Sequence, residues 1–223
     1  MLYTIGHSTL PADDFRDALD AAGVTTVVDT RSHPTSYWEQ YRREELEEWL
    51  AGRYEWWPQL GGWDTRHALL KDALHKVGVD LEPYLHGHFP KQRIAANRDR
   101  IDEEVDGTPT WQSVGLHDYQ FFQIQPEYLL GMTDLLRRCQ TDNLAVMCSE
   151  ACWWKCHRSM IADCAVFAGH DAQHIMPRFR KVKQPRCVVT LHSHKAVPDL
   201  DKRLAAYHPV VIRAWDKWRK HYG

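Results

Sequence analysis

Short apolar runs alternate with amphipathic stretches over the first part of the chain. Residues 2–5 and 24–29 are rich in β-branched or large apolar side chains, which is typical of buried strands. Between them, residues 11–22 carry apolar side chains at helical spacing, with Pro11 at the start and Gly23 at the end. This strand–helix–strand order predicts a right-handed crossover and a parallel sheet.

The same alternation returns in the second half of the chain. Residues 144–148 form the clearest buried strand, preceded by a helical pattern at 126–139 and followed by another at 159–168. Further strands are expected at 54–57, 172–176 and 187–191. Further helices are expected at 43–50 and around Trp215 and Trp218. The pattern as a whole predicts an α/β fold, with a mostly parallel sheet and helices on both faces.

Two stretches depart from this alternation. Residues 64–112 are irregular, charged and rich in His and Arg, and we interpret them as an insertion packed on the domain. Residues 178–186 are basic and interrupted by proline, and they open a basic C-terminal extension at about 178–223. We therefore expect a single α/β domain over 1–223 with these two additions.

Composition narrows the class of protein. Hydrophobic residues make up 43% of the 223 residues, which is enough for one sizeable core. The net charge of −2 argues against a protein that coats a polyanion, although a local basic groove is compatible with it. The chain has no apolar run long enough to span a membrane and no signal-peptide pattern at its start, so we expect a cytoplasmic protein with no membrane partner. The six cysteines are then expected to be reduced thiols, and no oligomeric state is indicated.

Polar side chains follow three of the predicted strands. The three clusters are Gly6-His7-Ser8, Asp29-Thr30-Arg31-Ser32 and Cys148-Ser149-Glu150. Because ligands gather at the carboxyl ends of parallel strands, we expect His7, Ser8, Asp29 and Arg31 to bind the substrate or an anion. The alternative is that Asp29 and Arg31 form a structural pair at the end of the sheet.

The densest group of reactive side chains lies just before the helix expected at 159–168. The field of a helix N-terminus favours an anion, and together with a neighbouring cation it lowers the pKa of a thiol. Cys156 is therefore a candidate nucleophile, His157 a candidate proton carrier and Arg158 a candidate anion clamp. Cys148 and Glu150 complete the candidate catalytic set.

Two other interpretations of this group stay open. In one, the thiols are inert and Arg158 ties the helix to Asp29 or Glu150. In the other, zinc or iron binds the cluster of Cys148, Cys152, Cys156 and His157. The spacing between these cysteines is wider than in common zinc sites, and no second cluster supplies further ligands. The sequence therefore requires no cofactor, and we assign no metal ligand.

Several segments resemble the family called domain of unknown function 488. They are Thr4-Ile5-Gly6-His7-Ser8, Val28-Asp29-Thr30-Arg31-Ser32-His33-Pro34, Leu60-Gly61-Gly62, and Cys148-Ser149-Glu150 followed by Cys156-His157-Arg158 and Ile161-Ala162-Asp163. They resemble that family's I-G-H-S, V-D-V-R-x-x-P, L-G-G and C-A-E…C-H-R…I-A-D motifs, in the same order. The resemblance implies an α/β fold and no settled activity, and it adds Gly61, Gly62 and Asp163 to the residues of interest. The Asp-Arg pair after the second strand is also similar to rhodanese-like domains, which suggests a rhodanese-like outline.

We expect from these residues a cysteine-dependent enzyme, a hydrolase or transferase, that acts on a phosphate-bearing substrate such as a nucleotide or nucleic acid. Trp153 and Trp154 beside the site could stack on bases, and the basic stretch at 178–186 could follow phosphates. One alternative is a non-catalytic nucleic-acid-binding module in which Arg31 and Arg158 only hold an anion. The other is a metal-dependent enzyme that uses the Cys/His cluster.

Overall fold

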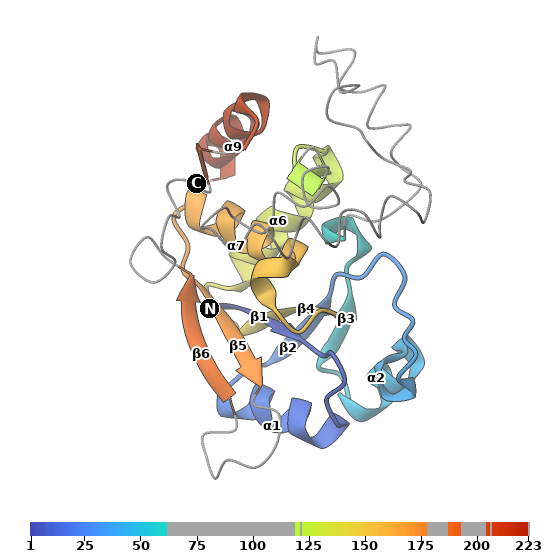
Figure 1. The fold of residues 1–223 in the computed structure, drawn as a ribbon. Coiled ribbons are helices and arrows are strands. Elements are labelled where there is room, and N and C mark those ends of the chain that lie inside the picture. The colour runs from blue at the N-terminus through green and yellow to red at the C-terminus, as the bar shows by residue number, and fades with distance from the viewer. Residues whose placement is uncertain (62–118, 121, 178–186, 193–203, 206, 223) are drawn as a thin grey trace, which may run out of the picture.

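The computed structural model describes residues 1–61, 119–120, 122–177, 187–192, 204–205 and 207–222. Within these residues, one central sheet carries helices on both of its faces (Figure 1). The insertion expected at 64–112 and the basic stretch at 178–186 lie outside the described residues, so the predicted domain organisation stays a prediction. None of the described helices is both long enough and apolar enough to cross a membrane.

The sheet has six strands, of which five run parallel. They are β1 (Leu2–Gly6), β2 (Thr26–Asp29), β3 (Tyr54–Trp56), β4 (Leu144–Cys148), β5 (Ala172–Pro177) and β6 (Cys187–His192). Their order across the sheet is β3-β2-β4-β1-β5-β6, and only β6 is antiparallel to its neighbour. The prediction of a mostly parallel α/β sheet is therefore confirmed, whereas the rhodanese-like outline stays a prediction.

The helices follow the predicted segments closely. They are α1 (Ala12–Ala21), α2 (Arg43–Trp49), α6 (Pro126–Arg138), α7 (His157–Phe167) and α9 (Pro209–Tyr222). Helix α1 ends before Gly23, which takes a positive φ of 65° that favours glycine. Helix α7 begins at His157, two residues before the start predicted from its apolar stripe. This earlier start places Arg158 in the first turn of the helix.

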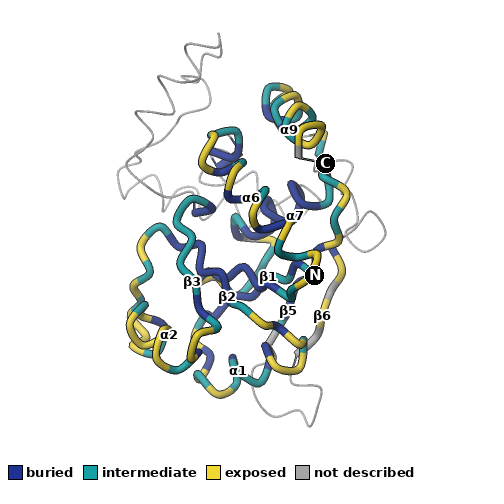
Figure 2. Tube along the Cα trace, turned by 180° about the vertical axis from the view of Figure 1, so that it is seen from behind, coloured by how far each residue is buried: buried dark blue, intermediate teal, exposed yellow. Residues whose placement is uncertain are grey.

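Two hydrophobic cores lie on opposite faces of the sheet. Helices α6, α7 and α9 cover one face, and α1 and α2 cover the other (Figure 1). Along β2, Val28 belongs to the first core and Val27 to the second. Figure 2 shows the middle of the sheet, around β1 and β2, as largely buried segments between these layers. Because successive residues of a strand point to opposite faces, neighbouring residues at a strand end also project into different layers.

Candidate active site

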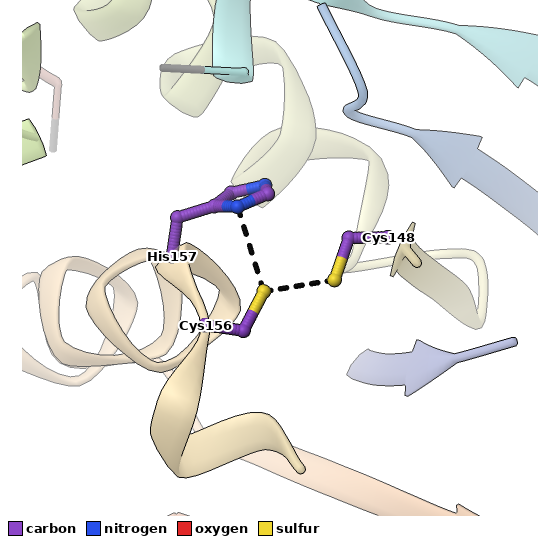
Figure 3. A group of neighbouring side chains, drawn as sticks. All are labelled: Cys148, Cys156 and His157. Atoms are coloured by element: carbon purple, nitrogen blue, oxygen red, sulfur yellow. Dashed lines mark hydrogen bonds between the residues drawn. The ribbon is translucent and has the colours of Figure 1, made fainter. Parts of the chain in front are cut away.

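Two cysteines from the ends of different elements meet in the site. Cys148 is the last residue of β4, and Cys156 directly precedes α7. The chain between them passes through the short helix η4 (Trp153–Lys155) and returns to the end of β4, so that the two sulfur atoms lie 2.8 Å apart (Figure 3). Both side chains are buried, with 2% of Cys148 and 3% of Cys156 exposed. At this distance one thiol donates a hydrogen bond to the other sulfur.

The ring of His157 connects the cysteine pair to β2. Its Nδ1 lies 3.5 Å from the Cys156 sulfur, and its Nε2 lies 2.9 Å from the Thr30 hydroxyl oxygen. The Thr30 hydroxyl donates its own proton to the carbonyl of Met147, so its oxygen accepts a hydrogen bond from Nε2 of His157. This arrangement fixes the proton on Nε2 and leaves Nδ1 facing Cys156. Nδ1 can therefore exchange a proton with the thiol.

Arg158 lies fully buried beside the two sulfur atoms. Its Nη2 donates a hydrogen bond to the carbonyl of Glu150, while its Nε and Nη1 have no hydrogen-bond partner within the described part of the chain. Burial disfavours the charged guanidinium, but the charges of Cys148 and Cys156 outweigh burial and raise the pKa of Arg158. The guanidinium therefore stays charged and stabilises negative charge on the sulfur atoms.

Gly6 makes room for this arrangement at the end of β1. A Cβ atom at this position would lie 1.7 Å from the carbonyl oxygen of Glu150 and 2.6 Å from Nη2 of Arg158. Any larger residue would push the β4–α7 connection and the arginine away from the sheet. The glycine of the first motif is thus required by close packing, because its backbone and that of Glu150 nearly touch.

The two cysteines differ in their acid–base behaviour. Burial alone would raise the pKa of Cys156, but the hydrogen bond from Cys148 and the positive charges of His157 and Arg158 outweigh it and hold the pKa well below its usual range. Burial and its role as hydrogen-bond donor to Cys156 raise the pKa of Cys148 well above that range. These opposite directions make Cys156 the sulfur that ionises first and Cys148 the thiol that donates to it.

Asp29 and Arg31 form a separate cluster with the aromatic residues of the α1–α2 side. Arg31 donates from Nε and Nη2 to the Asp29 carboxylate at 2.9 and 2.6 Å, and from Nη1 to the carbonyl of Tyr41 at 2.8 Å. The carboxylate also accepts a hydrogen bond from the Tyr54 hydroxyl at 2.7 Å. Every nitrogen of the guanidinium thus has an internal partner. This geometry favours the structural interpretation of the pair over the anion-binding one.

His7 belongs to this second cluster. Its ring stacks on Tyr41 with the centroids 4.0 Å apart, and its Nε2 lies 3.5 Å from Nη1 of Arg31. Burial, together with the positive charge of Arg31, lowers the pKa of His7 to about 4, although a hydrogen bond to the carbonyl of Ser8 opposes this shift. The ring is therefore neutral near pH 7.

The remaining candidate residues act through their backbones or lie outside the described chain. The N–H of Ser8 donates to the carbonyl of Ser149, which ties the end of β1 to the loop after β4. Glu150 contributes its carbonyl to Arg158 and its N–H, at 3.3 Å, to the Cys148 sulfur. A Cβ atom on Gly61 would lie 2.2 Å from the carbonyl oxygen of Thr30, so this glycine too serves close packing. Gly62 lies outside the described residues.

The two tryptophans of η4 have different surroundings. The indole of Trp153 stacks on the ring of His174 in β5, with the centroids 3.8 Å apart and the planes within 3°. Trp154 is 37% exposed. Trp153 therefore anchors the β4–α7 connection to the sheet, and Trp154 is the more exposed of the two.

Asp163 lies in a buried polar chain outside the cysteine site. Its carboxylate contacts Nε2 of His192 at 2.8 Å and accepts a hydrogen bond from the hydroxyl of Tyr207. His192 in turn contacts His174 at 2.8 Å, and His174 contacts the hydroxyl of Thr4 at 2.7 Å. These side-chain contacts join α7 to β6, β5 and β1, so the described contacts give Asp163 a structural role.

Two residues of the site escaped the sequence analysis. Thr30 orients His157, although the sequence analysis gave this residue no role of its own. Tyr119 places its ring 5.3 Å from that of His157 and donates its hydroxyl to the carbonyl of Leu60. The alternation of the strand could have placed Thr30 on the side of Cys148, but no local pattern marks Tyr119.

The Cys/His cluster fits a metal ion poorly. Cys148, Cys156 and His157 each offer a ligand atom within 4.8 Å of the others. However, the two sulfur atoms are 2.8 Å apart, whereas two thiolates on one tetrahedral zinc ion lie about 3.7 Å apart. The guanidinium of Arg158 also stands beside both sulfurs, where it opposes a second cation. Thiol chemistry therefore suits this arrangement better than metal binding.

Residues 11–77 and 96–165 match the model of the family described as Domain of unknown function DUF488. No curated protein and no solved structure matches the chain. The two matched segments cover more than half of the sequence and include both Asp29–Arg31 and Cys148–Asp163. The chain therefore belongs to the family of Domain of unknown function DUF488.

Proposed function

We propose that this protein is a cysteine-dependent enzyme that acts on a phosphate-bearing substrate of nucleotide size, with Cys156 as its nucleophile. One observation carries the proposal: the sulfur atoms of Cys156 and Cys148 lie 2.8 Å apart beside the buried charge of Arg158. A thiolate held in this way is ready to attack an electrophilic centre without prior loss of a proton.

His157 supplies the proton transfer that a covalent reaction needs. Its Nδ1 faces the Cys156 sulfur at 3.5 Å, and Thr30 holds the opposite edge of the ring. A ring fixed in this way can give a proton to a leaving group and take one from the attacking water or second substrate. Thr30 is then a positioning residue, since it acts through His157.

Arg158 supports the choice of an anionic substrate. Its Nε and Nη1 are buried and lack a hydrogen-bond partner within the described residues. A planar guanidinium beside the nucleophile suits two oxygens of a phosphate, and the N-terminus of α7 adds a favourable field. By contrast, the nitrogens of Arg31 are used by Asp29 and Tyr41.

The size of the substrate is argued from exposure and charge. Only 3% of Cys156 is exposed, so a small group reaches the sulfur more readily than a long polymer. Trp153 stacks on His174, and two cations near the C-terminus, Arg219 and Lys220, pair with Asp216. These residues therefore offer less to a nucleic acid than the sequence alone suggested, which favours a nucleotide over a nucleic-acid substrate.

Protection from alkylation tests the proposal. The intact protein would be treated with iodoacetamide at pH 6, with and without phosphate or a nucleoside monophosphate, and each cysteine would be followed by peptide mass spectrometry. Cys156 should react much faster than Cys139, because burial raises the pKa of the Cys139 thiol to about 11. The phosphate compounds should slow the labelling of Cys156, and Arg158→Lys should weaken this protection because an ammonium lacks the two-pronged geometry.

Two results would count against the proposal. If Cys156 reacts no faster than Cys139, it is not the nucleophile. If Cys156 reacts rapidly but no phosphate compound slows it, the thiolate stands and the phosphate-bearing substrate is ruled out.

A further inference from the structure

The proposed reaction uses one of the two cysteines as a nucleophile and leaves the second with only a supporting role. Cys148 is nevertheless held 2.8 Å from the Cys156 sulfur, and the N–H of Glu150 contacts its sulfur from another side. A single hydrogen bond to the thiolate does not need sulfur, since a hydroxyl would also donate it. A second sulfur at this distance adds the ability to form a disulfide.

We propose that Cys148 and Cys156 form a redox site that reacts with hydroperoxides, in which Cys156 is oxidised first and Cys148 then closes a reversible disulfide with it. The inference rests on the reactive Cys156 thiolate of the proposed function, but it makes a separate claim about Cys148.

The chemistry balances in two steps. In the first, the Cys156 thiolate attacks one oxygen of a hydroperoxide, the O–O bond breaks, and an alkoxide or hydroxide leaves and takes up a proton from solvent. Cys156 then carries a sulfenic acid. In the second, the Cys148 sulfur attacks the Cys156 sulfur, the S–O bond breaks, and the hydroxyl leaves as water with the proton of the Cys148 thiol. The two cysteines have lost two electrons, and the hydroperoxide has gained them.

The geometry suits the second step. The sulfur atoms need to approach by only about 0.8 Å to reach a disulfide bond length. Cys148 ends a central strand and Cys156 precedes a helix, so both backbones are held by regular structure. Neither sulfur has to leave the interior, because both are already buried. Closure is therefore expected to be faster than further oxidation of the sulfenic acid.

Arg158 makes the disulfide easy to reduce. In the reduced site its buried charge faces the Cys156 thiolate, and this charge pair stabilises the dithiol form. Disulfide formation removes the thiolate and leaves the guanidinium without that counter-charge, which is unfavourable in the interior. A disulfide whose reduced form is stabilised in this way is readily reduced. Oxidation would thus switch off the nucleophile reversibly and protect it from irreversible sulfinic acid.

The test is oxidation of the full chain with substoichiometric hydrogen peroxide, followed by peptide mapping without reductant. The expected product is a Cys148–Cys156 disulfide that dithiothreitol reverses. Cys148→Ser keeps a hydroxyl donor but cannot close the bond, so it should instead accumulate sulfenic acid, trapped by dimedone, and then sulfinic acid on Cys156. Cys164→Ser changes another buried thiol and is the matched control, which should form the disulfide as the parent chain does.

The outcomes separate this inference from the proposed function. Rapid alkylation of Cys156 at pH 6, with over-oxidised Cys156 and no disulfide after peroxide, would overturn the redox site and leave the nucleophile standing. Slow alkylation together with no reaction with peroxide would overturn both. If the disulfide forms but no phosphate compound slows the alkylation of Cys156, the redox site is supported and the phosphate-bearing substrate is overturned.

Discussion

The residues around the sulfur pair give two chemically identical side chains opposite roles. Cys156 has His157 at 3.5 Å and accepts the hydrogen bond from Cys148, so its charged form is favoured despite burial. Among the described contacts, the hydrogen bond of His157 goes to Cys156, whereas Cys148 supplies the shared proton, so the neutral form of Cys148 is favoured. The nucleophile is therefore selected by the immediate neighbours of each sulfur.

Removing the donor from this pair should weaken the thiolate. In Cys148→Ala the hydrogen bond to Cys156 is lost, so the pKa of Cys156 should rise. A hydrogen bond to a charged group contributes about 1.5–3 kcal/mol, which corresponds to a Cys156 pKa that is higher by about 1–2. The rate of iodoacetamide labelling, measured from pH 4 to pH 9, gives this pKa, and it should rise less in Cys148→Ser because the hydroxyl still donates. An unchanged pH profile in the alanine variant would show that Cys148 does not stabilise the thiolate.

His7 makes a prediction about stability and pH. Its pKa is lowered to about 4 in the folded chain from a usual value of about 6.5. The unfolded chain therefore takes up a proton as the pH falls below about 6.5 while the folded chain does not, and stability is lost progressively until the pH passes about 4. The loss of unfolding free energy from His7 amounts to about 3 kcal/mol.

Urea unfolding at several pH values between 7 and 4 tests this prediction. His7→Phe keeps a ring to stack on Tyr41 but binds no proton, so its stability should fall less steeply than that of the parent chain over this range. Parallel curves for the two proteins would show that His7 does not carry the pH dependence.

At the residue scale, the sequence indicated which side chains are reactive better than it indicated which residues contact them. The neighbours Cys156, His157 and Arg158 could be recognised because they precede a helix and combine a thiol, a base and a cation. The role of Thr30 depends on contact with His157 across 127 positions of the chain, which no local pattern reports.

The elements explain why the polar strand ends form two clusters. Thr30 and Cys148 project toward α7, whereas His7 and Asp29 project toward the α1–α2 side, because successive residues of a strand point to opposite faces. Both faces of this sheet are covered, so the strands read as continuous apolar runs, and the sequence did not reveal which residues share a face. The sequence analysis assigned His7 and Asp29 to the same substrate as Cys148, whereas their side chains lie in different layers.

The buried polar chain through Asp163 should matter for stability. Asp163→Ala leaves His192 and Tyr207 without their acceptor in the interior, so the free energy of unfolding should fall by about 3–5 kcal/mol. Asp163→Asn keeps one acceptor oxygen and should cost less. Urea unfolding compares these variants with Asp134→Ala, an exposed carboxylate of α6 that serves as the control. A loss no larger than that of the control would show that the buried hydrogen bonds of Asp163 contribute little to stability.

For the molecule as a whole, the sequence predicted the type of each described element and their order along the chain. It did not predict which strands lie next to each other in the sheet. The apolar runs identified the six described strands because each is short and carries β-branched or apolar residues, although Val189 and Leu191 of β6 are exposed. The position of β4 between β2 and β1 depends on pairings such as Leu2 with Leu144, which join residues far apart in the chain. Such pairings depend on the packing of the whole domain, so the spacing of residues along one strand does not encode them.

The ionisation of Cys156 in the intact protein tests the central claim most directly. The ultraviolet absorbance of thiolate would be recorded from pH 4 to pH 9 for the parent chain and for Cys156→Ser, and the difference gives the titration of this one sulfur. The thiolate should already be present at pH 6, because Cys148, His157 and Arg158 stabilise it. Cys139→Ser should show no such difference, since the pKa of that thiol is raised to about 11. A difference for Cys156→Ser that appears only above about pH 8, as for an ordinary cysteine, would contradict the account.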